Sequence, residues 1–200
     1  MDLDARAHAV EPRAILVSVA GDPPAQGGIE QVVLDLAKFH NGRWALQLDA
    51  AFAHRETPVV ILAQGLACLA VSWWAQLSPR SYLRSVRGAV FDSPLSVDFA
   101  HVAAAASFRT GPTYRLPFPS VVVSDASFQI EQVLALADKW GSQFVAQPSD
   151  LDADHTNRHA SSDGTAALLA HARLLDRADA ETQGRAKGLR VHPLPADGRR

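Results

Sequence analysis

The stretch Pro58-Val59-Val60-Ile61-Leu62-Ala63-Gln64-Gly65-Leu66-Ala67-Cys68-Leu69-Ala70 decides the fold of this chain. Its first part, residues 59–62, is a short aliphatic run that is typical of a strand buried on both faces. An apolar pattern with helical spacing begins directly after Gly65. Strand and helix can follow each other this closely only where the residues at the junction are small. We therefore expect a sharp strand-to-helix turn centred on Gly65.

Strands and helices alternate on both sides of this turn. The apolar runs predict strands at 14–19, 43–48 (a weaker pattern), 59–62, 88–91, 120–123 and 143–145. Apolar residues at helical spacing predict helices at 29–39, 66–77, 130–141 and 165–175. This alternation predicts an α/β protein with a largely parallel sheet.

Composition limits the class of protein. The chain has 200 residues, is 48% apolar and 20% charged, and has a net charge of −2, which is typical of one globular domain. We expect that domain at 14–176, between flexible tails at 1–13 and 177–200, the second of them mildly basic. The near-neutral charge gives no reason to expect a nucleic acid or a membrane as partner.

Cysteine content and apolar segments indicate the cellular compartment. Cys68 is its one cysteine, which excludes an intrachain disulfide and fits a reducing compartment. No apolar run reaches the ~18 residues of a membrane span, and 1–13 lacks the apolar core of a signal peptide. We expect a cytoplasmic monomer or homodimer that binds a small molecule or a protein whose identity the sequence does not reveal.

The turn at Gly65 has the steric pattern of a nucleophile elbow. Such an elbow reads Gly-x-Ser-x-Gly, with small flanking residues because strand and helix nearly collide around a strained central residue. Here the five residues are Ala63-Gln64-Gly65-Leu66-Ala67, with glycine in place of the nucleophile. Glycine has no hydroxyl and cannot attack a carbonyl.

The block 59–75, with Cys68 and a Trp-containing helix after the turn, resembles the small serine hydrolases related to retinoblastoma-binding protein nine and bacterial YdeN. Those proteins carry Ala-His-Ser-Leu-Gly-Cys at this point. Segments 116–123 and 131–145 resemble the same family, and the likeness covers about 14–175. It implies an α/β-hydrolase-like three-layer sandwich, with a mostly parallel sheet of about five or six strands and helices on both faces.

The resemblance also implies where a Ser-His-Asp triad would lie. The serine position is Gly65, and the acid position is Asp125, which is present. The histidine position falls on Asp150 or a neighbour within 149–152. The triad is therefore vestigial and cannot carry out acyl transfer by the usual route.

A small pocket is predicted at the vestigial triad. We expect its lining to include Ala20, Gly21, Gln64 and Leu66. If Asp125 and Asp150 converge there, their like charges would raise the apparent pKa of the pair unless a cation or water separates them. The space left by the missing serine side chain would then hold a water, a cation or a small ligand.

A further departure from the family is expected upstream of the turn. If 43–48 is the second strand, only residues 49–57 separate it from the strand at 59–62. A parallel crossover needs about a dozen residues or more. The family helix at this place would then be reduced to about a turn, or the second strand would pair abnormally, and one side of the cleft would be remodelled.

Other chemistries are weaker on the sequence. Ser93, Ser124 and Ser127 are loop serines that would have to replace the missing nucleophile, and Cys68 is expected to be buried and inert. Residues 150–163 lack the glycine and glutamate of a calcium loop, and His155 and His159 lack the glutamate of a zinc protease motif. We expect no metal and no cofactor, and a packing role for Trp73, Trp74 and Trp140.

Three functions remain open from the sequence. The first is a catalytically inactive member of this hydrolase family with a binding or regulatory role. The second is an esterase-like hydrolase of carboxylic esters that uses a relocated nucleophile. The third is a structural subunit of an oligomer, which exposed apolar residues around 49–57 would favour.

Overall fold

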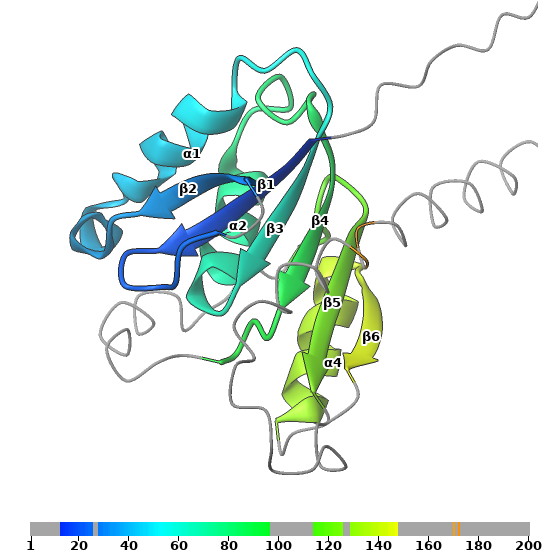
Figure 1. The fold of residues 1–200 in the computed structure, drawn as a ribbon. Coiled ribbons are helices and arrows are strands. Elements are labelled where there is room, and N and C mark those ends of the chain that lie inside the picture. Colours follow the sequence, from blue (N-terminus) through cyan, green and yellow to red (C-terminus); the bar gives the residue numbers. More distant parts are fainter. Residues whose placement is uncertain are drawn as a thin grey trace, which may run out of the picture.

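The computed structural model describes residues 13–25, 28–96, 114–125 and 129–147, together with Ala170 and Ala172. Within these ranges the elements follow in the order β1 (Arg13–Val19), β2 (Glu30–Leu34), η1 (Leu36–Asn41), α1 (Trp44–Phe52), β3 (Val59–Gln64), α2 (Leu66–Leu77), β4 (Val86–Asp92), β5 (Ser120–Asp125), α4 (Ile130–Trp140) and β6 (Gln143–Gln147) (Figure 1). The predicted tails, the predicted helix at 165–175 apart from Ala170 and Ala172, and residues 148–163 lie outside the described residues.

The strands form one six-stranded sheet in the order β2-β1-β3-β4-β5-β6, and each neighbouring pair is parallel. The prediction of an α/β fold with a parallel sheet is confirmed. The chain moves from β1 to one side to form β2 and then crosses back to form β3 on the other side of β1. The carboxyl ends of β1 and β3 therefore flank the point where the strand order reverses, which is where open α/β sheets place their ligands.

Both faces of the sheet are buried. Helices α1, α2 and α4 pack on one face, where alternate strand residues such as Val17, Ile61 and Phe91 join their core (Figure 1). The opposite face holds a second cluster, which consists of Leu16, Val60, Leu62, Val90, Val121 and Val123. Ala25, Ile29 and the helical residue Ala172 pack against that cluster. Burial on both faces explains why the central strands are continuous apolar runs.

The predicted helix at 29–39 is wrong. Residues Glu30–Leu34 form the edge strand β2, which pairs in parallel with β1, and only Leu36–Asn41 is helical, as a 3₁₀ helix. The spacing of Ile29, Val32 and Val33 fits a helix, but alternate residues at 32 and 34 also place one strand face on the core. Pairing with β1 decides between these patterns, and no local sequence signal contains that pairing.

The weak strand predicted at 43–48 is also wrong, since Trp44–Phe52 is helix α1. Trp44, Leu48 and Phe52 recur every four residues and are buried, whereas Leu46 is 63% exposed. Alternation of 44, 46 and 48 was the misleading signal. The crossover from β2 to β3 thus runs through η1 and α1 and has full length. The expected loss of a helix at 49–57 is therefore corrected.

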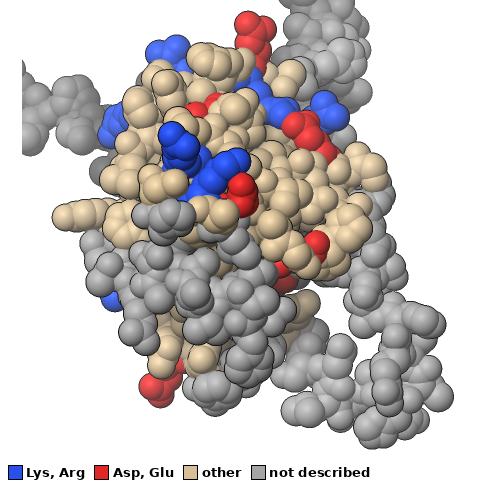
Figure 2. Space-filling view, turned by 90° about the vertical axis from the view of Figure 1, so that its left-hand side faces the viewer, with Lys and Arg blue, Asp and Glu red and all other residues tan. Residues whose placement is uncertain are grey.

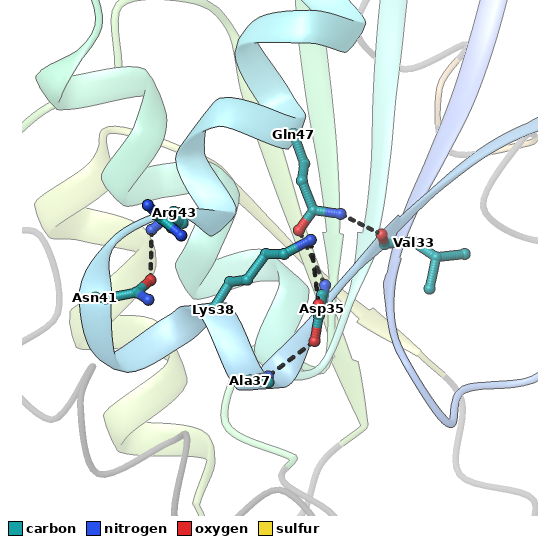
Figure 3. A network of polar contacts seen from close by, with 7 residues as sticks. All are labelled: Val33, Asp35, Ala37, Lys38, Asn41, Arg43 and Gln47. Atoms are coloured by element: carbon teal, nitrogen blue, oxygen red, sulfur yellow. Dashed lines mark hydrogen bonds and ion pairs between the residues drawn. The ribbon is translucent and has the colours of Figure 1, made fainter.

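The amide of Gln47 on α1 binds the outer edge of the sheet (Figure 3). Its Nε2 donates to the carbonyl of Val33 at 3.0 Å, and its Oε1 accepts from the N–H of Asp35 at 3.0 Å. The side chain thus satisfies two backbone groups of the edge strand, as a neighbouring strand would. Asp35 in turn caps η1 by accepting from the N–H of Ala37, and it pairs with Lys38.

Charges on the face that carries α1 and the β2 edge are interspersed. Figure 2 shows lysine and arginine next to acidic residues there, within a mostly uncharged surface. Glu30 is one centre of this arrangement, because it binds Arg55 and lies 3.8 Å from the Arg13 guanidinium. None of the helices in the described part of the chain is long and apolar enough to span a membrane.

Candidate functional site

Gly65 forms the predicted sharp turn between β3 and α2. Its backbone has φ 50° and ψ −123°, a conformation that residues with a side chain rarely adopt. The N–H of Gly65 donates to the carbonyl of Asp92 at 2.9 Å, and its own carbonyl accepts from the N–H of Cys68 at 3.1 Å. The strained geometry that an elbow requires is therefore present, on a residue without a side chain.

The position of a side chain at residue 65 is not empty. A Cβ atom built on Gly65 would lie 2.8 Å from the backbone carbonyl oxygen of Ser96. That oxygen belongs to the turn that follows β4, so a serine at 65 would require this backbone to move. The Ser96 carbonyl oxygen therefore lies within the space that a serine side chain would need, and the predicted pocket stays a prediction.

Asp92, the last residue of β4, organises the polar side chains around this turn. Gln64 lies opposite Asp92 in the register of β3 and β4, and its Nε2 donates to Asp92 Oδ2 at 3.2 Å. Ser93 Oγ donates to Asp92 Oδ1 at 3.0 Å. The two carboxylate oxygens therefore bind one residue each from the neighbouring strand and the following loop.

Ser93 is held in a strained backbone conformation. Its φ is 48°, and among the described residues it is the one non-glycine residue with a positive φ. It also precedes Pro94, whose ring restricts the preceding residue to extended backbone. The N–H of Ser93 donates to Val123 at 2.8 Å, and its carbonyl accepts from Ser96 at 2.9 Å. These bonds maintain a conformation that costs about 1–3 kcal/mol.

Asp22 lies on the β1 side of the site. Its carboxylate accepts a hydrogen bond from the N–H of Val19 at 2.7 Å, at the end of β1. Ala20 and Gly21 form the intervening turn, and both are exposed. Gly21 has φ 106°, which only glycine adopts readily. The turn after β1 is thus tied back to its own strand and carries a carboxylate.

Cys68 lies in the core behind the elbow. Its side chain is 0% exposed, and its sulfur lies 3.2 Å from the Ala63 carbonyl and 3.4 Å from the Asp92 carbonyl. Burial raises the pKa of the Cys68 thiol well above its usual value, and the nearby charges of Asp92 and Asp22 raise it further. The thiol is therefore protonated and shielded, and the expectation of a buried Cys68 is confirmed.

The other predicted site residues are distributed as follows. Asp125 ends β5, with its backbone opposite Gln147 of β6, and its side chain is outside what the structure describes. Asp150, Ser127, His155 and His159 lie outside the described residues. The approach of Asp125 and Asp150 therefore stays a prediction.

The predicted pocket residues differ in what they can offer a ligand. Leu66 is 2% exposed and packs in the core, whereas Gln64 is half-buried at the carboxyl end of β3. Trp74 and Trp140 are buried in the same core and Trp73 packs against it, which confirms their packing role.

Asp22 and Asp92 are site residues that the sequence did not single out. A usable signal existed, since Asp22 follows β1 beside the reversal of strand order, and Asp92 ends β4 at the same carboxyl edge of the sheet. Within the described ranges no three histidine, cysteine or acidic residues are grouped closely enough to hold a metal ion.

Comparison with known proteins relates this chain to a family. The sequence model of a family described as Serine hydrolase matches residues 23–170. The fold is similar to the crystal structure of a protein described as a YdeN-like hydrolase from Pectobacterium atrosepticum, with a TM-score of 0.50 and 16% sequence identity over 70% of this chain and 78% of that chain. No curated protein sequence matches this chain.

Proposed function

Because this chain belongs to the serine hydrolase family, we propose that it uses the family scaffold for binding and does not turn over esters through a Ser-His-Asp triad. The observation that carries this proposal is the elbow itself. Gly65 keeps the φ and ψ of a strained turn, while the Ser96 carbonyl oxygen lies 2.8 Å from where its Cβ would be. The turn is thus complementary to glycine, and a nucleophilic side chain there would require the Ser96 backbone to move.

The chemistry of the remaining groups supports the same proposal. Acyl transfer by this route needs a hydroxyl, an imidazole that takes and returns its proton, and a carboxylate that orients the imidazole. Removal of the serine or the histidine alone costs about 10⁶-fold in turnover in a well-studied protease. Here the serine position is Gly65, and the histidine position falls on Asp150 or a neighbour.

The site favours a ligand that donates hydrogen bonds or carries positive charge. The Asp92 carboxylate binds Gln64 next to the elbow, and the Asp22 carboxylate binds the N–H of Val19 at the end of β1. A carboxylate at Asp125 and another at Asp150 would add to the same field. An anion would be repelled by this field, whereas an ammonium or amide group would be attracted. Ala20, Gly21 and Gln64 would form the rim of such a site.

Steady-state hydrolysis of p-nitrophenyl acetate and butyrate tests the proposal. The protein should show no sustained release of p-nitrophenolate above the uncatalysed rate. Gly65→Ser should not restore turnover, because the histidine position falls on Asp150 or a neighbour and the Ser96 carbonyl obstructs the new side chain. Gly65→Ala is the matched control, since it adds the same steric load without a hydroxyl. Sustained, saturable turnover by the unaltered chain would overturn the proposal.

A further inference from the structure

We propose that Ser93 is the nucleophile that remains in this site and that it accepts an acyl group once, without turnover. Three side chains form a nucleophile, a base and a group that orients the base. Ser93 Oγ donates to Asp92 Oδ1 at 3.0 Å, and Gln64 Nε2 donates to Asp92 Oδ2 at 3.2 Å. This is the arrangement by which a weak hydroxyl nucleophile is activated, with a carboxylate in place of the imidazole.

The backbone of Ser93 supports the assignment. Residues held at positive φ against a following proline persist where the surrounding structure over-determines them, and such strain clusters at functional sites. Two backbone hydrogen bonds, to Val123 and from Ser96, fix Ser93 at the carboxyl edge of the sheet. The turn that begins at Ser93 contacts the elbow, since the Ser96 carbonyl lies against Gly65.

The N-terminus of helix α2 is next to the turn that begins at Ser93. Gly65 is the N-cap of the twelve-residue helix α2, and the helix dipole gives that end a partial positive charge. That partial charge offsets part of the field of the Asp92 carboxylate, which by itself disfavours an oxyanion at Ser93. Ser93 and Asp92 are both half-buried, so an ester can reach a hydroxyl that is still partly shielded from water.

The covalent step balances without another reactant. The Ser93 oxygen bonds to the acyl carbon of an activated ester, and its proton moves to the Asp92 carboxylate. The bond to the leaving group breaks, p-nitrophenolate departs with the electron pair, and Asp92 releases the proton to water. Deacylation would need a base that activates water after this step, and the partner that the structure gives Ser93 Oγ is the Asp92 carboxylate, a weaker base than an imidazole. The inference rests on the proposed function, because the acyl-serine persists only if no triad hydrolyses it.

The experiment is a burst assay of the full chain with p-nitrophenyl acetate, followed by proteolytic digestion and peptide mass spectrometry. We expect close to one equivalent of p-nitrophenolate, no sustained turnover, and a 42-dalton acetyl adduct on the peptide that contains Ser93. Ser93→Ala and Ser93→Gly should both lose the burst and the adduct. Asp92→Asn should slow the burst roughly 10²- to 10⁴-fold while keeping the shape of the side chain.

Ser96→Ala is the matched control, because Ser96 is exposed in the same turn. This variant should keep the burst and the adduct, which separates activation of Ser93 from simple access to the turn. An absent burst, or an adduct on another residue, would overturn the inference and leave the proposed function intact. Sustained turnover that Ser93→Ala abolishes would instead overturn the proposed function and the single acylation together.

Discussion

At the scale of single residues, two positive φ angles at one edge of the sheet shape the site. Gly65 and Ser93 have φ of 50° and 48°, and their turns touch through the Ser96 carbonyl. The glycine adopts its angle without a Cβ clash, whereas the serine adopts it against its own side chain and the following proline. The strained backbone of Ser93 and the missing side chain of Gly65 are therefore linked, because the turn that begins at Ser93 packs against Gly65.

Substitution of Gly65 measures that packing. Gly65→Ala should lower the free energy of unfolding by about 2–4 kcal/mol, because it combines backbone strain with overlap against Ser96. Gly42→Ala is the matched control, since Gly42 has φ 72° and nothing within 4 Å of a built Cβ. That control should cost about 1 kcal/mol. Urea unfolding compares the two. Equal losses would mean that the 93–96 turn yields freely.

Two substitutions of Ser93 separate strain from hydrogen bonding. Ser93→Ala removes the Oγ bond to Asp92 and keeps the strained φ, whereas Ser93→Gly removes the bond and the strain together. We expect Ser93→Gly to be more stable than Ser93→Ala by about 1 kcal/mol. Thermal and urea unfolding of both variants measure this difference. A less stable glycine variant would contradict the assignment of strain at this residue.

The Cys68 thiol links stability to alkaline pH. Burial raises its pKa in the folded state, while an unfolded thiol ionises near pH 8.5. Below about pH 8.5 the thiol is protonated in both the folded and the unfolded chain, and the free energy of unfolding does not depend on its ionisation. As pH rises from there toward the folded-state pKa, only the unfolded chain loses the proton, which lowers the free energy of unfolding. The free energy of unfolding should fall by up to about 1.4 kcal/mol per pH unit in this window. Cys68→Ala should remove that slope, and identical slopes would refute the assignment.

At the scale of elements, the edge strand β2 depends on a side chain of α1. Gln47 replaces a missing neighbour strand by binding the carbonyl of Val33 and the N–H of Asp35 (Figure 3). Edge strands with unpaired backbone groups invite pairing with other chains. The single amide thus stabilises β2 and blocks part of its outer edge.

Removal of this amide should loosen β2 and expose its edge. Gln47→Ala should cost about 1–3 kcal/mol and speed hydrogen exchange at the Asp35 amide, because two backbone groups lose their partners. Leu46→Ala is the matched control on the same helix, since Leu46 is 63% exposed and its truncation removes little packing. Similar effects of the two substitutions would show that Gln47 is not the stabilising contact.

The sequence predicted those elements whose signals are local. Continuous apolar runs identified β1, β3, β4 and β5 because these strands are buried on both faces. The sequence predicted a helix where β2 lies and a strand where α1 lies. Val32 and Val33 fit the period of a helix and that of a strand, and only pairing with β1 selects the strand. Gly65 was predicted from small neighbours in the chain. Asp92 was not, because its contact with Gln64 arises from strand register, to which residues far apart in sequence contribute.

At the scale of the whole molecule, the handedness of the crossovers explains where the site lies. Right-handed connections carry α1, α2 and α4 to one face of the sheet as the chain advances from β2 toward β6. The connection from β1 to β2 runs the other way, and its residues Ala25 and Ile29 pack on the opposite face. The loops after β1 and β3 therefore diverge, and Gly21, Asp22 and Gly65 all lie at the carboxyl edge where they do so.

The same topology specifies how a triad would have to be rebuilt. It needs a nucleophile after β3, an acid after β5 and a histidine after β6, which are strands of one parallel sheet whose carboxyl ends share an edge. Gly65→Ser with Asp150→His should give slow esterase turnover that neither single substitution gives. The histidine base has no effect without the serine hydroxyl, and the hydroxyl is not activated without the base. The Ser96 contact should keep that rate low, and activity should rise if Ser96→Gly loosens the turn.

Addition of Asp125→Asn to this double variant should remove most of the new activity, since the acid orients the histidine and stabilises its charged form. Steady-state p-nitrophenyl acetate hydrolysis measures each step, with circular dichroism and urea unfolding to confirm that every variant is folded. A folded double variant no faster than its parents would place the histidine position elsewhere in 149–152. Activity that survives Asp125→Asn would mean that the acid after β5 is not part of the site.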